Sequence, residues 1–213
     1  MDLTLAAISL TILIFSAILH EVAHGLLADR LGDPTASLAG RLTLNPIKHI
    51  DPFMSVILPF LLIVSGSPVI FGAAKPVPVD PFNLRDGKKD MALVALAGPL
   101  TNVVIAVFAA LILRSLGFAS NLPEGTYFLL FVLQLVVRLN LLLAIFNLLP
   151  IPPLDGSKIV AMFLPDREAA SYLSIGTFGI FIIFFLLMFP IGGFSLGGFM
   201  FGLLNLAQQL LGV

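Results

Sequence analysis

Long apolar runs separated by short polar connectors dominate this chain. Five of these runs predict helices that cross a membrane, and they cover residues 3–28, 91–113, 126–149, 174–189 and roughly 194–211. A helix rises about 1.5 Å per residue, so the first run alone can cross the roughly 30 Å hydrocarbon core of a bilayer. The last two runs are shorter, and glycines interrupt them.

A sixth apolar run, residues 52–72, is less regular. Pro59 and the Ser-Gly-Ser-Pro sequence at residues 65–68 interrupt it, so we predict that this run is re-entrant or irregular. The polar connectors, residues 29–51, 73–90, 114–125 and 165–168, are too short to form a separate soluble domain. The pattern therefore predicts one all-α domain over residues 1–213, a polytopic membrane helix bundle with about five spanning helices.

The composition agrees with a membrane protein and argues against several other classes. Of the 213 residues, 59% are hydrophobic and 11% are charged, whereas a soluble domain carries about 25% charged residues. The net charge of −1 and the lack of a basic run give no support to nucleic-acid binding. Because the chain has no cysteine, any bound metal must be held by nitrogen and oxygen atoms.

The first apolar run contains the sequence His-Glu-Val-Ala-His at residues 20–24. Its two histidines and its glutamate are the only ionisable residues of that run. Ionisable side chains at membrane depth are costly, so they need partners or a function. The spacing puts His20 and His24 one turn apart on one helix face, with Glu21 beside them. The run therefore predicts a zinc site inside the membrane, with Glu21 as general base.

The third zinc ligand must come from elsewhere, because a catalytic zinc ion usually takes three protein ligands and keeps one position for water. The best candidate is Asp155, which follows three prolines at the end of the run 126–149. Asp155 could also cap the helix that follows, and one carboxylate could serve both roles. His49 is an alternative ligand, but it lies in a polar connector beside Lys48 and Asp51, where a loop-ordering or interfacial role is favoured.

Three sequence elements, in order along the chain, carry a resemblance to a known family. They are His20–His24, the Gly-Pro-Leu-Thr-Asn sequence at residues 98–102, and Asn-Leu-Leu-Pro at 147–150 running into Leu-Asp-Gly at 154–156. Together they resemble the site-2 protease family of intramembrane zinc metalloproteases, in its compact branch without a PDZ domain. The resemblance implies that one Zn²⁺ ion per chain is bound by His20, His24 and Asp155, and that Glu21 is the catalytic base. It also implies that Asn147 and Asn102 bind the substrate backbone or the oxyanion, although buried amides often only hold helices together.

The positions of the predicted ligands constrain the topology. His24 lies six residues before Arg30, roughly 9 Å from the charged end of its helix, and Asp155 lies at the end of its own run. The two can reach one metal only if their helices cross the membrane in the same direction, so the run 52–72 must not cross. Most basic residues lie in connectors 29–51 and 73–90. The positive-inside rule then predicts a zinc site toward the cytoplasm and an N-terminus outside.

These observations predict a zinc-dependent endopeptidase of the cell membrane that hydrolyses peptide bonds in or near transmembrane segments, as in regulated intramembrane proteolysis. Its expected partners are a transmembrane protein or peptide substrate and the lipid bilayer, with no nucleic acid. The small-residue pairs Gly193/Gly197 and Gly198/Gly202 suit packing within the chain or a homo-oligomer.

Three other functions fit the sequence less well. An integral-membrane prenyl-protein endoprotease also uses His-Glu-x-x-His, but its third ligand is a distal glutamate on a helix. The glutamates that follow Glu21, at 124 and 168, lie in polar connectors. A zinc transporter would need ligands on several helices to pass the ion across, whereas those predicted here converge at one depth. A relative without proteolytic activity would be expected to have lost Glu21.

Overall fold

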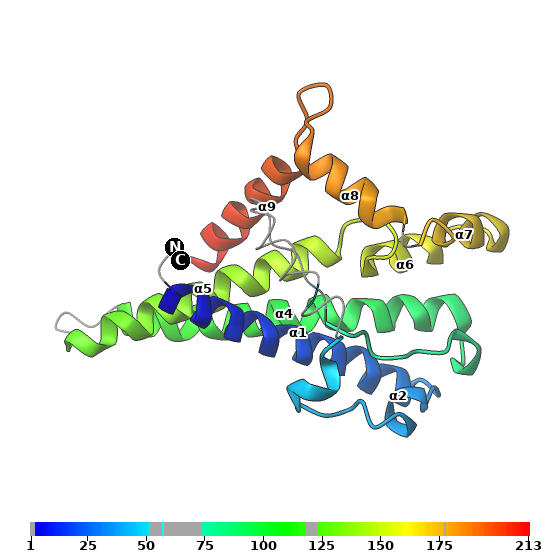
Figure 1. Ribbon diagram of the computed structural model, residues 1–213, viewed down its shortest axis with the longest axis horizontal. Helices are drawn as coiled ribbons and strands as arrows, with labels where there is room; N and C mark the ends of the chain where they lie inside the picture. Colours follow the sequence, from blue (N-terminus) through cyan, green and yellow to red (C-terminus); the bar gives the residue numbers. More distant parts are fainter. Residues whose placement is uncertain (1–2, 52–56, 58–73, 118–122, 177) are drawn as a thin grey trace.

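The computed structural model describes residues 3–51, 57, 74–117, 123–176 and 178–213, and this part of the chain is all-α (Figure 1). A single antiparallel bridge between Ile191 and Phe194 is the only β pairing among these residues. In chain order the helices are α1 (Leu3–Arg30), α2 (Thr35–Leu38), η1 (Pro46–His49), η3 (Pro81–Asn83), α4 (Gly87–Gly117), α5 (Glu124–Asn147), α6 (Asp155–Met162), α7 (Asp166–Leu173), α8 (Phe178–Met188) and α9 (Leu196–Leu211).

Helices α1, α4 and α5 form the centre of the bundle, and each is long and apolar enough to cross a membrane. Helices α1 and α5 run in the same direction, and α4 runs in the opposite one (Figure 1). Three alanines of α4, at 106, 109 and 110, pack against Val137 and Leu141 of α5. Such small side chains let two helix backbones approach closely. The protein is therefore a helical membrane bundle, as predicted.

The prediction of about five spanning helices is not supported. The described residues form three helices of spanning length, and a fourth span would have to combine α7 with α8, which are bent by 67° relative to each other. Helices α8 and α9 hold 11 and 16 residues, about 17 and 24 Å, which is shorter than the ~30 Å core. Gly192 and Gly193 both adopt positive φ between them, and the two helices form the hairpin at the top of Figure 1.

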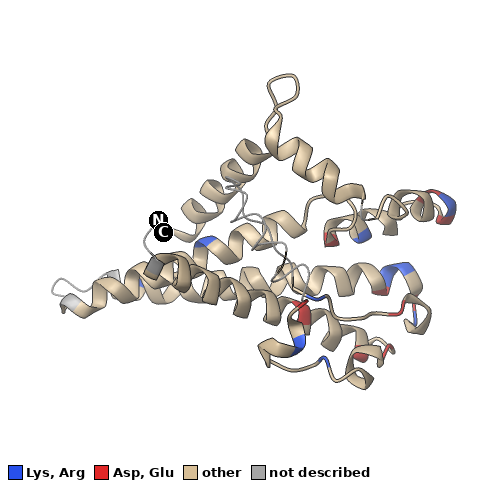
Figure 2. Ribbon diagram, in the orientation of Figure 1, with Lys and Arg blue, Asp and Glu red and all other residues tan. Residues whose placement is uncertain are grey.

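The connector between α1 and α4 folds against one end of the bundle. The Leu31 carbonyl at the end of α1 accepts a hydrogen bond from the Arg85 N–H (3.2 Å), and the His49 carbonyl accepts one from the Lys75 N–H (2.8 Å). Most charged residues lie at this end and along α6 and α7 (Figure 2). The run 52–72, which was predicted to be re-entrant, joins His49 to Lys75 and, except for residue 57, lies outside the described residues.

Asp33 ties the two sides of this connector together. It is fully buried, and its carboxylate accepts hydrogen bonds from the Asp80 N–H (2.7 Å), from Asn83 Nδ2 (3.0 Å) and from the Thr35 hydroxyl. Burial favours the neutral carboxyl group, but these hydrogen bonds outweigh it and lower the pKa of Asp33 below its ordinary value. The charged form of Asp33 therefore holds the segment before α4 against the end of α1.

Candidate metal centre

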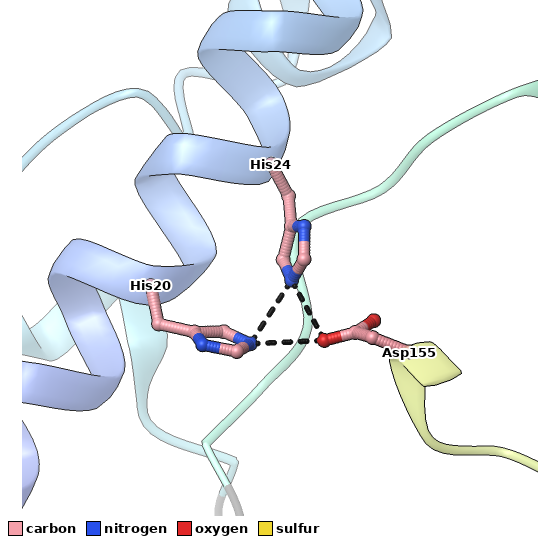
Figure 3. Close-up of side chains that lie close together, drawn as sticks. All are labelled: His20, His24 and Asp155. Carbon is pink, nitrogen blue, oxygen red and sulfur yellow. Dashed lines mark hydrogen bonds and ion pairs between the residues drawn. The ribbon is translucent and has the colours of Figure 1, made fainter. Parts of the chain in front are cut away.

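Two histidines of α1 and one aspartate of α6 meet inside the bundle (Figure 3). The exposed fractions of His20, His24 and Asp155 are only 6%, 7% and 6%. The two Nε2 atoms lie 3.0 Å apart, and Asp155 Oδ2 lies 3.1 Å from His20 Nε2 and 3.2 Å from His24 Nε2. The structure therefore brings together the three residues that the sequence predicted as metal ligands, although Asp155 is far from the histidines along the chain.

Asp155 reaches the histidines because the chain turns sharply between α5 and α6. It is the first residue of α6, whereas Leu154 occupies the N-cap position and makes no side-chain capping bond. One carboxylate oxygen of Asp155 faces the imidazoles, and the other, Oδ1, accepts a hydrogen bond from Lys158 Nζ (3.1 Å). Of the two roles considered for Asp155, contact with the histidines is the one seen here.

The second nitrogen of each imidazole has an oxygen partner. His24 Nδ1 lies 2.6 Å from the Val94 carbonyl oxygen, and His20 Nδ1 lies 2.6 Å from Asn102 Oδ1. Since a carbonyl oxygen can only accept, each Nδ1 carries a proton and donates it, and in the neutral imidazole the lone pair then lies on Nε2. Two lone pairs and a carboxylate oxygen then face one another, an arrangement that a positive ion stabilises. Orientation of a metal-bound histidine by its outer nitrogen is common in metal sites.

The three facing atoms fit a zinc ion. Zinc holds histidine nitrogen and carboxylate oxygen at about 2.0–2.2 Å, so adjacent ligand atoms of a tetrahedral site lie roughly 3.3 Å apart. The observed separations of 3.0, 3.1 and 3.2 Å are close to this value. Three protein ligands leave the fourth position open, as in catalytic zinc sites. Among the described residues, these three are the ones grouped closely enough to hold a metal ion.

Gly98 of α4 keeps the space in front of the histidines open. A Cβ atom at this position would lie 2.4 Å from His24 Nε2 and 2.5 Å from His20 Nε2. These distances are only slightly longer than a zinc–nitrogen bond, so the methyl group of an alanine would occupy the region that the metal needs. The glycine of the Gly-Pro sequence at residues 98–99 thus serves the site because it has no side chain.

Gly98→Ala is therefore expected to lower the zinc content of the purified protein at least tenfold, an order-of-magnitude estimate for the loss of a preformed metal position. Metal analysis by mass spectrometry would measure the zinc-to-protein ratio. Gly202→Ala is the matched control, because Gly202 also lies within a helix and a Cβ there meets nothing within 4 Å. Full zinc content in the Gly98 variant would show that the metal does not occupy this space.

Asn102 lies behind His20, away from any open surface. It is fully buried, and its amide nitrogen donates to Asn140 Oδ1 (2.9 Å) and to the Ser16 carbonyl (3.5 Å). All its polar atoms therefore have partners within the protein. Sequence reasoning did not assign a role to Asn140, although a fully buried amide in an apolar helix is the kind of costly group that signals one.

The other residues predicted for the site have hydrogen-bond partners outside the His-His-Asp group. Glu21 directly follows His20, and its Oε2 accepts a hydrogen bond from the Val77 N–H (2.7 Å). Asn147 is half-buried at the end of α5 and donates to the Leu143 carbonyl one turn earlier (3.0 Å). His49 is buried in the connector, where its Nε2 donates to the Thr43 carbonyl (2.8 Å). Its contact agrees with the loop-ordering role favoured above.

Comparison with known proteins assigns the family. The sequence model of peptidase family M50 matches residues 120–190. YwhC of Bacillus subtilis, which bears the name of a zinc metalloprotease, is 36% identical over 187 residues, which cover 86% of this chain and 81% of YwhC. The chain belongs to peptidase family M50. Rip2 of Mycobacterium tuberculosis, which carries the same kind of name, is 32% identical over 200 residues, or 93% of this chain and 71% of Rip2. No solved structure matches the chain significantly.

This M50 peptidase is a zinc-dependent metalloendopeptidase in a membrane, which confirms the predicted family, enzyme class and cofactor. The matched region contains α5 and Asp155, and the alignments with YwhC and Rip2 extend over most of the chain. Two contacts were not predicted from the sequence. Lys158 contacts the candidate ligand Asp155, and Val77 contacts the candidate base Glu21.

Proposed function

We propose that this M50 peptidase hydrolyses peptide bonds in or beside the transmembrane segments of membrane proteins, with one zinc ion held by His20, His24 and Asp155. The observation that carries the proposal is the depth of the His-His-Asp group. Both histidines belong to the apolar helix Thr4–Arg30, and His24 lies roughly 9 Å along the helix from its charged end. A peptide bond must enter the membrane region to reach a metal held at this depth.

Zinc, when bound, supplies the Lewis acid that polarises the scissile carbonyl and makes water more acidic. Glu21 would accept the proton that the attacking water loses, while the water oxygen bonds to the carbonyl carbon. When the carbon–nitrogen bond breaks, Glu21 would return this proton to the leaving amine. Its Oε2 is engaged by Val77, and its Oε1 makes no hydrogen bond to the described residues, so one carboxylate oxygen is available for water.

The residues around the ligands would hold them in position. The Val94 carbonyl fixes His24, and Lys158 leaves one oxygen of Asp155 turned toward the imidazoles. The contacts of Asn102 favour orientation of His20 over the substrate-binding role that the family resemblance implied. Asn147 keeps that proposed role, because its half-buried side chain lies at the end of α5 where the chain turns toward Asp155.

We also propose that the zinc site opens toward the cytoplasm and that α1 begins outside. The basic residues of the α1–α4 connector support this orientation through the positive-inside rule. The parallel course of α1 and α5 is what lets His24 and Asp155 lie at the same side of the membrane. Residues 1–213 would form one protease domain, alone or as a homo-oligomer. Its physiological role would be regulated intramembrane proteolysis.

The direct test is cleavage of a single-pass membrane protein by the purified protein in liposomes. We expect a cut inside or next to the transmembrane segment, located by mass spectrometry, which stops when zinc is chelated and returns when zinc is restored. A soluble peptide with the same cut sequence but no transmembrane segment is the control, and it should remain intact. Equal cleavage of the soluble peptide would contradict a requirement for a membrane-embedded substrate.

A further inference from the structure

An extended segment containing two prolines passes next to Glu21. This proline segment, residues 74–80, has the sequence Ala-Lys-Pro-Val-Pro-Val-Asp and forms neither helix nor strand. Proline has no N–H and disfavours helical backbone at the residue before it. Pro76 and Pro78 therefore keep the segment extended and leave Val77, between them, with the only N–H group of the stretch 76–78.

Both ends of the proline segment are fixed to the rest of the connector. At its start, the Lys75 N–H donates to the His49 carbonyl (2.8 Å), and Arg41 Nη2 donates to the Lys75 carbonyl (2.8 Å) and the Pro76 carbonyl (3.3 Å). At its end, the Asp80 N–H donates to the Asp33 carboxylate (2.7 Å). Arg41 and Asp33 are both buried, so these anchors belong to the folded structure and not to a loose surface.

The middle of the segment is pressed against α1 one turn beyond Glu21. Val77 is buried, and it packs at Gly25, where a Cβ atom would lie 2.8 Å from Val77 Cγ1 and 2.6 Å from Leu42 Cδ2. Only glycine at this position lets the segment lie so close to the helix. The same approach brings the Val77 N–H to 2.7 Å from Glu21 Oε2.

We propose that the proline segment positions Glu21 for catalysis, with the Val77 N–H as the group that orients its carboxylate and Arg41 as the clamp that holds the segment. This inference rests on the proposed role of Glu21 as general base. A free glutamate side chain can rotate about three bonds, whereas a base must point at the water it deprotonates. The hydrogen bond to Oε2 fixes the carboxylate and leaves Oε1 for the water. Misplacement of a reacting group by about 1 Å can cost roughly 10²-fold in rate.

Val77→Pro tests this inference, because it removes the N–H between two existing prolines and keeps an apolar side chain. We expect kcat for cleavage of a single-pass substrate to fall at least tenfold, as an order of magnitude, while KM and zinc content stay unchanged. Val79→Pro is the control, since it adds a proline to the same segment at an N–H that has no partner among the described residues. This control should retain kcat.

A kcat of Val77→Pro equal to that of Val79→Pro would overturn the inference. If Val77→Pro is purified without zinc, a second variant replaces it in the test. In this variant the α-hydroxy acid analogue of valine stands at position 77, so that an ester replaces the peptide bond and only the N–H is lost. An unchanged kcat in the ester variant also overturns the inference. Failure of the proposed function is distinguishable, because Glu21→Gln would then cleave as fast as the unmodified protein. An inactive Glu21→Gln protein together with a fully active Val77→Pro protein would refute only the role of the proline segment.

Discussion

Glu21→Gln is expected to reduce kcat for substrate cleavage by about 10²–10⁴-fold, the range that a general base contributes, while the protein keeps its zinc. Glutamine has nearly the same size and shape, and its amide oxygen can still accept the hydrogen bond that Val77 donates to Glu21. It cannot accept a proton from water at neutral pH. Because Glu21 is not among the three residues grouped around the candidate metal position, the substitution should leave metal binding intact.

The measurement combines initial cleavage rates at saturating substrate with metal analysis of the same preparations. Glu168→Gln is the matched control, since it makes the same chemical change at an exposed residue of α7 and should leave both quantities unchanged. A Glu21→Gln protein that cleaves as fast as the unmodified protein would refute the proposed mechanism. Loss of zinc in that variant would instead show that Glu21 contributes to the metal site.

The three residues of the candidate metal centre could be predicted from the sequence because of where their charges lie. His20 and His24 interrupt an apolar run, and the high cost of ionisable groups in lipid singles them out. Asp155 follows the prolines that end another apolar run. It is far from the histidines along the chain, and the family resemblance supported its assignment to the same metal ion. The structure adds the reason they fit: their ligand atoms lie 3.0–3.2 Å apart.

Contacts between distant backbone groups could not be predicted in the same way. The N–H of Val77 reaches Glu21 because the anchors of the proline segment and the absence of a side chain at Gly25 allow it. Each of these contacts joins positions far apart in the chain, and hydrophobic patterning carries no information about them. Asn102 is a second example. The free-energy cost of a polar side chain in an apolar helix predicts that it has a partner, but it does not predict that the partner is His20.

Hydropathy predicts about five membrane crossings, whereas the described residues support three, or four if α7 and α8 form one bent span. The C-terminal region is apolar almost throughout. Hydropathy predicts that such a run lies in lipid or in the protein interior, but it does not predict where the chain turns. Glycines at 192 and 193 turn the chain between α8 and α9, and Gly179 of α8 lies so close to the α5–α6 turn that a Cβ there would lie 1.5 Å from the Pro152 carbonyl oxygen. At Gly179 the hairpin thus packs on the loop that precedes Asp155, and its two helices are shorter than a full span.

Asp155→Asn is expected to lower zinc affinity by more than about 100-fold, since even changes to groups behind the ligands of a metal cost about 10–100-fold. The carboxylate is the one negatively charged member of the group, and an amide oxygen is a weaker zinc ligand. The charge of Lys158 adds to the effect. Its ammonium group lies 3.1 Å from Asp155 Oδ1, and without the carboxylate it would oppose a second positive charge nearby.

Asp166→Asn is the matched control for this change. Asp166 is the first residue of α7 as Asp155 is of α6, and it likewise accepts from a lysine, with Lys88 Nζ 2.7 Å from its Oδ1. Competition with a chelator of known affinity would measure zinc binding in both variants, independently of activity. The control loses an aspartate–lysine pair at the same helix position, although the Asp166 side chain is exposed and that of Asp155 is buried. A selective loss of zinc affinity in Asp155→Asn would therefore not reflect the helix start or the loss of the lysine pair. Equal zinc affinity in the two variants would mean that the third ligand is another residue, and that the contact between Asp155 and the histidines serves packing alone.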